Sequence, residues 1–172
     1  MKEDIRKMAI RAYHKVKNVK NKKLIIIDFR LPKDEQRLWV FDMTKNRIIH
    51  HTYVAHGVNS GLRYPKKFSN VRGSLKSSLG VALTAETYYG KHGLSLKLDG
   101  LEEGFNSNMR QRYVVIHGAK YVRENGRVGR SWGCPAVSME RYEEIINDIK
   151  GGAVLFSYYP DEKYLRESKY IN

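Results

Sequence analysis

The stretch LIIIDF, residues 24–29, decides the fold class of this 172-residue chain. Its β-branched residues are typical of a short strand buried in a protein interior. A helix is predicted just before it, over residues 3–17, where apolar side chains recur at the spacing of one helical face. Pro32, Lys33 and Asp34 follow the stretch and predict that the strand ends there in a turn.

Strand patterns recur along the rest of the chain. Residues 37–43 and 47–55 flank the polar TKN and predict a hairpin. The remaining elements are predicted as strands at 80–90, 95–100, 112–118 and 153–159, and as a late helix over 139–149 with Ser138 as its cap and Gly151-Gly152 at its end. Because most connections are too short for helical crossovers, we expect a mainly β fold with a mainly antiparallel sheet system.

The length fits one domain, residues 1–172, with its core over residues 24–159. Residues 56–80 interrupt the strand pattern, and a loop of this length is either functional or disordered. Hydrophobic residues make up 41% of the chain and charged residues 29%, as in a soluble globular protein. No apolar run reaches the length of a transmembrane segment, and the first twenty residues lack the apolar region of a signal peptide.

The net charge is +14. One interpretation is a lysine-rich surface that aids solubility, and the other is attraction to a polyanion such as nucleic acid, anionic lipid or an acidic envelope polymer. No recognised nucleic-acid module is visible, so we expect no specific nucleic-acid partner. We expect no metal and no cofactor. A single cysteine excludes an internal disulfide and a zinc site built from several cysteines.

That cysteine, Cys134, lies in the segment GRSWGCPAV, residues 129–137. It is either a small buried hydrophobe or a nucleophile. Gly133 leaves the preceding amide uncovered and Pro135 fixes the next φ, a geometry suited to an oxyanion hole at the thiol. A candidate base is His117, at the exit of the apolar strand YVVI, although a strand-end histidine also serves by bonding a backbone carbonyl. A papain-like arrangement is disfavoured, because there the cysteine precedes the histidine.

His117-Gly118, followed by Ser131-Trp132-Gly133-Cys134, resembles the signature of the YkuD-type L,D-transpeptidases. The blocks VAHGVNSG, SSLGVALTAETYYGKHG, SLKLDGLEEGFN, VVIHGA and GRSWGCPA resemble the murein L,D-transpeptidase catalytic-domain branch and cover most of residues 24–157. Two features depart from the wider family, namely Trp132 before the Gly-Cys pair and Pro135-Ala136 after it.

The resemblance implies a β-sandwich-like catalytic domain in a secreted or periplasmic enzyme, whose signal peptide would lie upstream of these residues. It implies that Cys134 forms a thioester with a peptidoglycan stem peptide and releases D-alanine, with His117 as base. Trimming by water, as in an L,D-carboxypeptidase, and a non-catalytic wall-binding module of the same fold are the alternatives. Oligomeric state is not indicated.

Further site residues are predicted, and each also has a purely structural interpretation. Ser131 orients His117, bonds the substrate or forms a turn. Arg130 binds a substrate carboxylate or is a solvated surface residue. Tyr89 and His92 lie in a loop over the cleft, or are respectively a packed tyrosine and a loop histidine. Trp132 and Gly118 complete the predicted substrate contacts.

Overall fold

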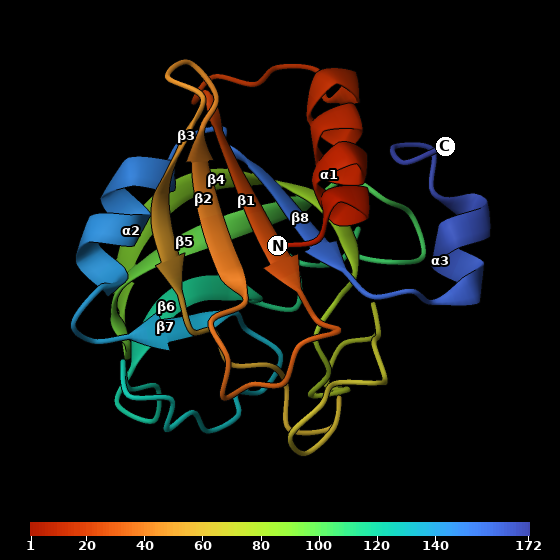
Figure 1. Ribbon diagram of the computed structural model, residues 1–172. Coiled ribbons are helices and arrows are strands. Elements are labelled where there is room, and N and C mark those ends of the chain that lie inside the picture. The colour runs from red at the N-terminus through yellow and green to blue at the C-terminus, as the bar shows by residue number, and fades with distance from the viewer.

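The computed structural model describes residues 1–172 and is built around one eight-stranded sheet (Figure 1). Its strands are β1 (Lys23–Asp28), β2 (Leu38–Asp42), β3 (Arg47–Thr52), β4 (Gly80–Gly90), β5 (Gly93–Gly100), β6 (Val115–Ala119), β7 (Ala136–Ser138) and β8 (Val154–Tyr158). In space they lie in the order β3-β2-β1-β8-β4-β5-β6-β7. Neighbours are antiparallel except for β1 with β8 and β6 with β7.

The two ends of this sheet approach each other. Ala55, just beyond β3, forms an isolated bridge with Ala136 of β7, and its N–H donates to the Ala136 carbonyl at 2.9 Å. The sheet therefore curls until it is nearly closed, and the main core joins its strands to buried side chains of the helices. The predicted mainly β fold with a leading and a late helix is confirmed, and it is formed by one curved sheet.

Three helices cover the sheet from outside (Figure 1). They are α1 (Glu3–Lys15), α2 (Tyr142–Ile149) and α3 (Glu162–Glu167). The buried apolar face of α1 packs against β1 and β8, and α2 buries three isoleucines beside β5 and β6. Tyr164 fixes α3, because its hydroxyl donates to the buried Glu102 carboxylate at 2.8 Å. None of the helices has the length and hydrophobicity needed to cross a bilayer.

Three details differ from the sequence prediction. Strand β7 was not predicted, and neither was α3, which lies in the charged tail. The prediction that Ser138 caps the late helix is wrong, because Ser138 belongs to β7 and its hydroxyl donates to Glu124 at 2.5 Å. The helix begins at Tyr142, and Gly151 follows its end with a φ of +76° as expected.

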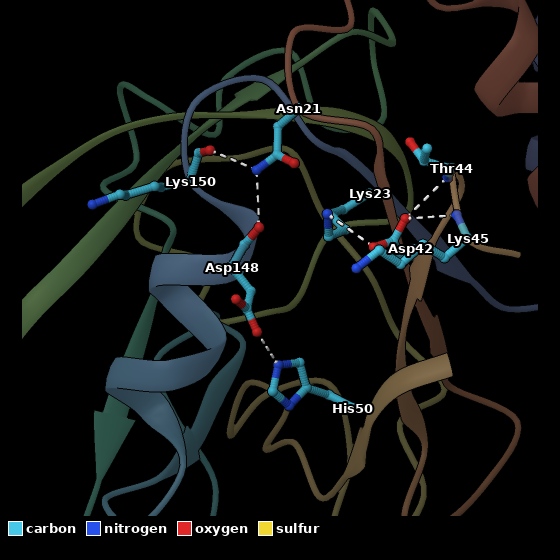
Figure 2. A network of polar contacts seen from close by, with 8 residues as sticks. All are labelled: Asn21, Lys23, Asp42, Thr44, Lys45, His50, Asp148 and Lys150. Carbon is cyan, nitrogen blue, oxygen red and sulfur yellow. Dashed lines mark hydrogen bonds and ion pairs between the residues drawn. The ribbon is translucent and has the colours of Figure 1, made fainter. Parts of the chain in front are cut away.

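A polar network attaches α2 to the sheet (Figure 2). Asn21, just before β1, donates to the carbonyls of Asp148 and Lys150 at 2.9 and 2.8 Å. From the other side, His50 of β3 contacts the Asp148 carboxylate through Nε2 at 2.6 Å. The C-terminal end of α2 is therefore held to two segments that are far apart in sequence.

Two long segments, residues 56–79 and 120–135, extend from the same end of the sheet (Figure 1). They are hydrogen-bonded to each other through Ser131, whose N–H donates to the His56 carbonyl at 2.9 Å and whose carbonyl accepts from Val58 N–H at 2.7 Å. The loop at 56–79 is therefore ordered, and it supports the segment that carries Cys134.

Candidate active site

Cys134 lies in the turn before β7, beside the beginning of β6. Because β6 and β7 are parallel with His117 opposite Ala136, Cys134 lies alongside Val115. Its Sγ accepts from Val115 N–H at 3.4 Å and donates to the Tyr113 carbonyl at 3.4 Å. Tyr113 has a φ of +55°, a conformation that costs a non-glycine residue about 1–3 kcal/mol and that concentrates at functional sites.

His117 is held in one tautomer by the backbone. Its side chain is buried, and Nδ1 lies 2.9 Å from the Gly118 carbonyl. A carbonyl only accepts hydrogen bonds, so Nδ1 carries the proton and the neutral ring keeps a lone pair on Nε2. Nε2 has no hydrogen-bond partner in the protein. Arg112 Nε is the only side-chain nitrogen or oxygen that is both fully buried and without a partner, so His117 Nε2 keeps some contact with solvent.

Burial lowers the pKa of His117, and His92 and Lys91 lower it further, so the ring is neutral at pH 7. Burial raises the pKa of the Cys134 thiol, while the Val115 N–H, Arg112 and Lys91 act in the opposite direction. The resting site therefore holds a thiol and a neutral imidazole. No hydrogen bond joins them, but both lie in the field of Lys91.

The turn around Gly133 admits only glycine. Its φ is +120°, and a Cβ there would lie 2.7 Å from the Lys76 carbonyl oxygen. Gly133 N–H donates to Ser131 Oγ at 3.1 Å, and that hydroxyl donates to the Cys134 carbonyl at 2.6 Å. Ser131 therefore forms the turn, and the Gly133 amide, expected in the oxyanion hole, is occupied. The Cys134 N–H has no acceptor in the protein and is the amide left open.

The tip of the β4–β5 hairpin covers the histidine. His92 stacks on His117 with ring centroids 4.0 Å apart and an interplanar angle of 13°. The neighbouring Lys91 places its Nζ 5.4 Å from the ring centroid of Trp132, which is 73% exposed. Tyr89, at the end of β4, is 83% exposed and is open to a ligand.

Arg130 and Gly118 have more structural roles than predicted. Arg130 donates through Nη1 to the carbonyls of Val58 and Gly61, which leaves Nε and Nη2 unpaired. Gly118 is buried, and a Cβ there would lie 2.6 Å from Tyr142. Gly118 therefore admits α2 and offers its carbonyl to His117.

The sequence reasoning missed Arg112. Its guanidinium holds the loop of residues 56–79 by donating to the carbonyls of Ser69 and Lys76 at 2.7 and 2.8 Å, and to the hydroxyls of Ser78 and Ser74 at 2.6 and 3.1 Å. The same group lowers the pKa of Cys134. Its only signal in the sequence is its position at the start of the predicted strand 112–118.

One cluster has the residue types of a metal site. The ligand atoms of His50, Glu144 and Asp148 lie within 4.8 Å of one another. However, His50 Nδ1 accepts from Arg141 Nη2 at 3.0 Å, so Nε2 carries the proton that it donates to Asp148 (Figure 2). A metal on Nε2 would force an N–H at Nδ1 against the arginine donor. This cluster is a structural brace.

The family model for the L,D-transpeptidase catalytic domain, YkuD_2, matches residues 1–158. The chain belongs to this family. Sequence comparison with curated proteins finds no match.

Solved structures show distant likeness. Bd1075 of Bdellovibrio bacteriovorus is 15% identical with a TM-score of 0.49, over 80% of this chain and 48% of that one. An L,D-transpeptidase from Mycobacterium smegmatis is 13% identical with a TM-score of 0.49, over 80% and 59%. One from Stackebrandtia nassauensis is 13% identical with a TM-score of 0.47, over 92% and 67%. The chain thus spans about half to two thirds of the length of these proteins.

Proposed function

We propose that this chain is a cysteine L,D-transpeptidase that acts on peptidoglycan stem peptides through a thioester on Cys134. The observation that carries the proposal is the parallel pairing of β6 with β7, which brings the thiol of Cys134 to the Val115 N–H of the strand whose histidine keeps Nε2 free. Membership of the L,D-transpeptidase catalytic-domain family supports the same class of reaction.

The first half-reaction begins with a neutral thiol, because burial raises the pKa of Cys134. Nε2 of His117 accepts the thiol proton as the sulfur attacks the carbonyl of an L-residue joined to a terminal D-alanine. The negative charge that develops on the carbonyl oxygen faces the open Cys134 N–H. The C–N bond then breaks, His117 returns the proton to the departing amine, and a thioester remains.

The second half-reaction releases the enzyme. An amine of a neighbouring stem peptide attacks the thioester, and His117 takes a proton from the amine as the carbon–sulfur bond breaks. His117 then gives that proton to the thiolate, which restores the thiol and the neutral ring, and the new amide links two stems. Water in place of the amine gives trimming, so cross-linking and L,D-carboxypeptidase activity share every step up to the thioester.

Four side chains around the thiol are proposed as substrate contacts. The unpaired Nε and Nη2 of Arg130 are free to bind a carboxylate in a two-point contact. Trp132 and Tyr89 offer exposed aromatic surface, and His92 lies on the ring of the proposed base. The peptidoglycan substrate implies a periplasmic or secreted site of action, and the net charge of +14 favours an envelope that carries carboxylates.

The test uses a disaccharide-tetrapeptide with D-alanine at its terminus, incubated with the wild-type protein, Cys134→Ser and Cys134→Ala. We expect intact-mass detection of a thioester on the wild type, release of D-alanine and stem-to-stem products. Both variants should fold normally by circular dichroism and lose at least about a thousandfold in rate, because removal of a nucleophile removes the covalent pathway. Turnover retained by Cys134→Ala would refute the proposal.

The same experiment separates the alternatives. D-alanine release without dimers, even with acceptor in excess, would indicate a carboxypeptidase. Binding of the fragment by wild type and Cys134→Ala alike, with no thioester and no released D-alanine, would indicate a wall-binding module.

A further inference from the structure

A concave site lies beside the thiol-bearing segment, and half of its ten lining residues are cations. It has a volume of about 600 Å³. Lys33, Arg63, Lys120, Arg123 and Arg127 line it, and Asp34 is the only acid among its lining residues.

Most of this positive charge is uncompensated within the protein. The one carboxylate is already bound, because Arg63 Nε donates to both oxygens of Asp34 at 3.0 and 3.1 Å. Lys33 donates to the Val128 carbonyl, a neutral group. Lys120, Arg123 and Arg127 are exposed and have no ion-pair partner. These last three cations are therefore free to bind an anion.

The two arginines are placed side by side by a short hairpin. Val122 and Val128 are buried and form an isolated antiparallel bridge, and Arg123 N–H donates to the Arg127 carbonyl at 3.0 Å. Gly126 closes the turn with a φ of +85°. Because the backbone is fixed, less conformational entropy is lost when a ligand binds the two guanidinium groups.

The field behind the cleft is also positive. Arg37 is fully buried and donates only to neutral acceptors, the carbonyls of Leu31 and Val54 and Nδ1 of His56. Burial lowers the pKa of Lys33, and Arg130 and Arg37 lower it further. Fixed cations without a carboxylate partner favour a bound anion in the adjoining cleft.

The position of the cleft indicates which anion. Tyr121 and Gly129 are part of its wall, and Gly129 N–H donates to the Tyr121 carbonyl at 2.7 Å, so the cleft adjoins the segment that continues to Cys134. With a volume of about 600 Å³, the site admits a few residues of an extended chain. The ligand is therefore a short segment adjacent to the group that reacts with the thiol.

We propose that this cationic cleft binds carboxylates of the peptide on which Cys134 acts, with Arg123 and Arg127 as their principal partners. The identity of the ligand as that peptide rests on the proposed function, whereas binding of carboxylates by the cleft does not.

Binding is tested in the Cys134→Ala protein, so that no turnover is needed. The probes are the dipeptide alanyl-glutamate, which carries two free carboxylates, its diamide, inorganic phosphate and a single-stranded oligonucleotide, each titrated by NMR. We expect the dicarboxylate to bind and the diamide to fail. Arg123→Gln/Arg127→Gln should lower the affinity for the dicarboxylate at least about tenfold. Lys7→Gln/Lys17→Gln, on and just after α1, also removes two positive charges and should leave that affinity unchanged.

Equal weakening by both double variants would overturn the proposal, since the effect would then be one of net charge. So would equal binding of the diamide, or tighter competition by phosphate or the oligonucleotide, which would assign the cleft to phosphate ligands. In active enzyme, Arg123→Gln/Arg127→Gln should raise KM and leave the reactivity of Cys134 toward iodoacetamide unchanged. Turnover without carboxylate binding would refute this inference alone. Carboxylate binding without turnover would refute the proposed function and the peptide as ligand, and would leave the carboxylate site standing.

Discussion

Two buried histidines of the same sheet show how differently this protein uses one residue type. In the brace between β3 and α2, His50 has both ring nitrogens engaged, Nε2 by Asp148 and Nδ1 by Arg141. In the thiol site, His117 has Nδ1 fixed by a backbone carbonyl and Nε2 without a partner. Burial is similar in the two regions. The difference is the one lone pair that the fold leaves free for chemistry.

His56 extends the comparison. It is fully buried, its Nδ1 accepts from Arg37 at 2.8 Å and its Nε2 donates to the Gly61 carbonyl at 3.0 Å. Like His50 it is fully satisfied, although it lies at the same end of the sheet as Cys134. Among the buried histidines, a free ring nitrogen selects His117 alone, and neither burial nor proximity to the site does so.

The largest expected effect tests the functional side of this contrast. His117→Gln should lower the rate of D-alanine release about 10²–10⁴-fold, the usual contribution of a general acid–base. His50→Gln should leave the rate per folded molecule unchanged and lower the free energy of unfolding by about 1–3 kcal/mol, because Asp148 and Arg141 lose a buried partner. Rates are measured on protein whose folded fraction is known from urea titration.

The contrast between the two regions would be broken by the reverse pattern. If His50→Gln slowed turnover as much as His117→Gln at equal folded fraction, a free ring nitrogen would not distinguish the functional histidine from the structural one.

The second prediction concerns stability and uses His56. Burial, followed by the charge of Arg37, lowers the pKa of His56 to about 4. The unfolded chain binds a proton near pH 6.5 and the folded one does not, so stability is present above pH 6.5 and is lost as pH falls toward 4. The loss from this residue amounts to about 3 kcal/mol.

Urea unfolding between pH 7.5 and 5 measures about 2 kcal/mol of this loss, because the folded-state pKa of about 4 lies below the window. Carboxylates with lowered pKa, such as Glu86, contribute only at lower pH, so the window reports on histidines. His56→Gln retains a donor and an acceptor but does not titrate, and should flatten the profile. A wild-type profile that is flat from pH 7.5 to 5 would contradict the assignment of His56 as a buried neutral ring.

The sequence predicted the elements whose signal is local. Periodicity predicted α1 and α2, a β-branched run predicted β1, and the resemblance carried by Cys134 and His117 points to the proposed thiol site. Strand β7 has only three residues and exists because β6 and Ala55 pair with it, so no local pattern encodes it. Arg112 acts through hydrogen bonds to residues 34 to 43 positions away, and Ser131 through the turn that it closes. Such contacts arise only on folding.

The smallest expected effect involves Lys91, which links the two reactive groups. The Lys91 charge lowers the pKa of His117 by disfavouring the imidazolium, and lowers the pKa of Cys134 by favouring the thiolate. Lys91→Gln should therefore move both limbs of a bell-shaped pH–rate profile upward, whereas a residue that merely packs on Trp132 would change the rate without moving them. The pH dependence of kcat/KM and of Cys134 alkylation checks this, with Lys97→Gln on the neighbouring strand as the matched control. Limbs that move in opposite directions would show that Lys91 does not act on the thiol and the imidazole together, and would separate the two groups that the proposed mechanism couples.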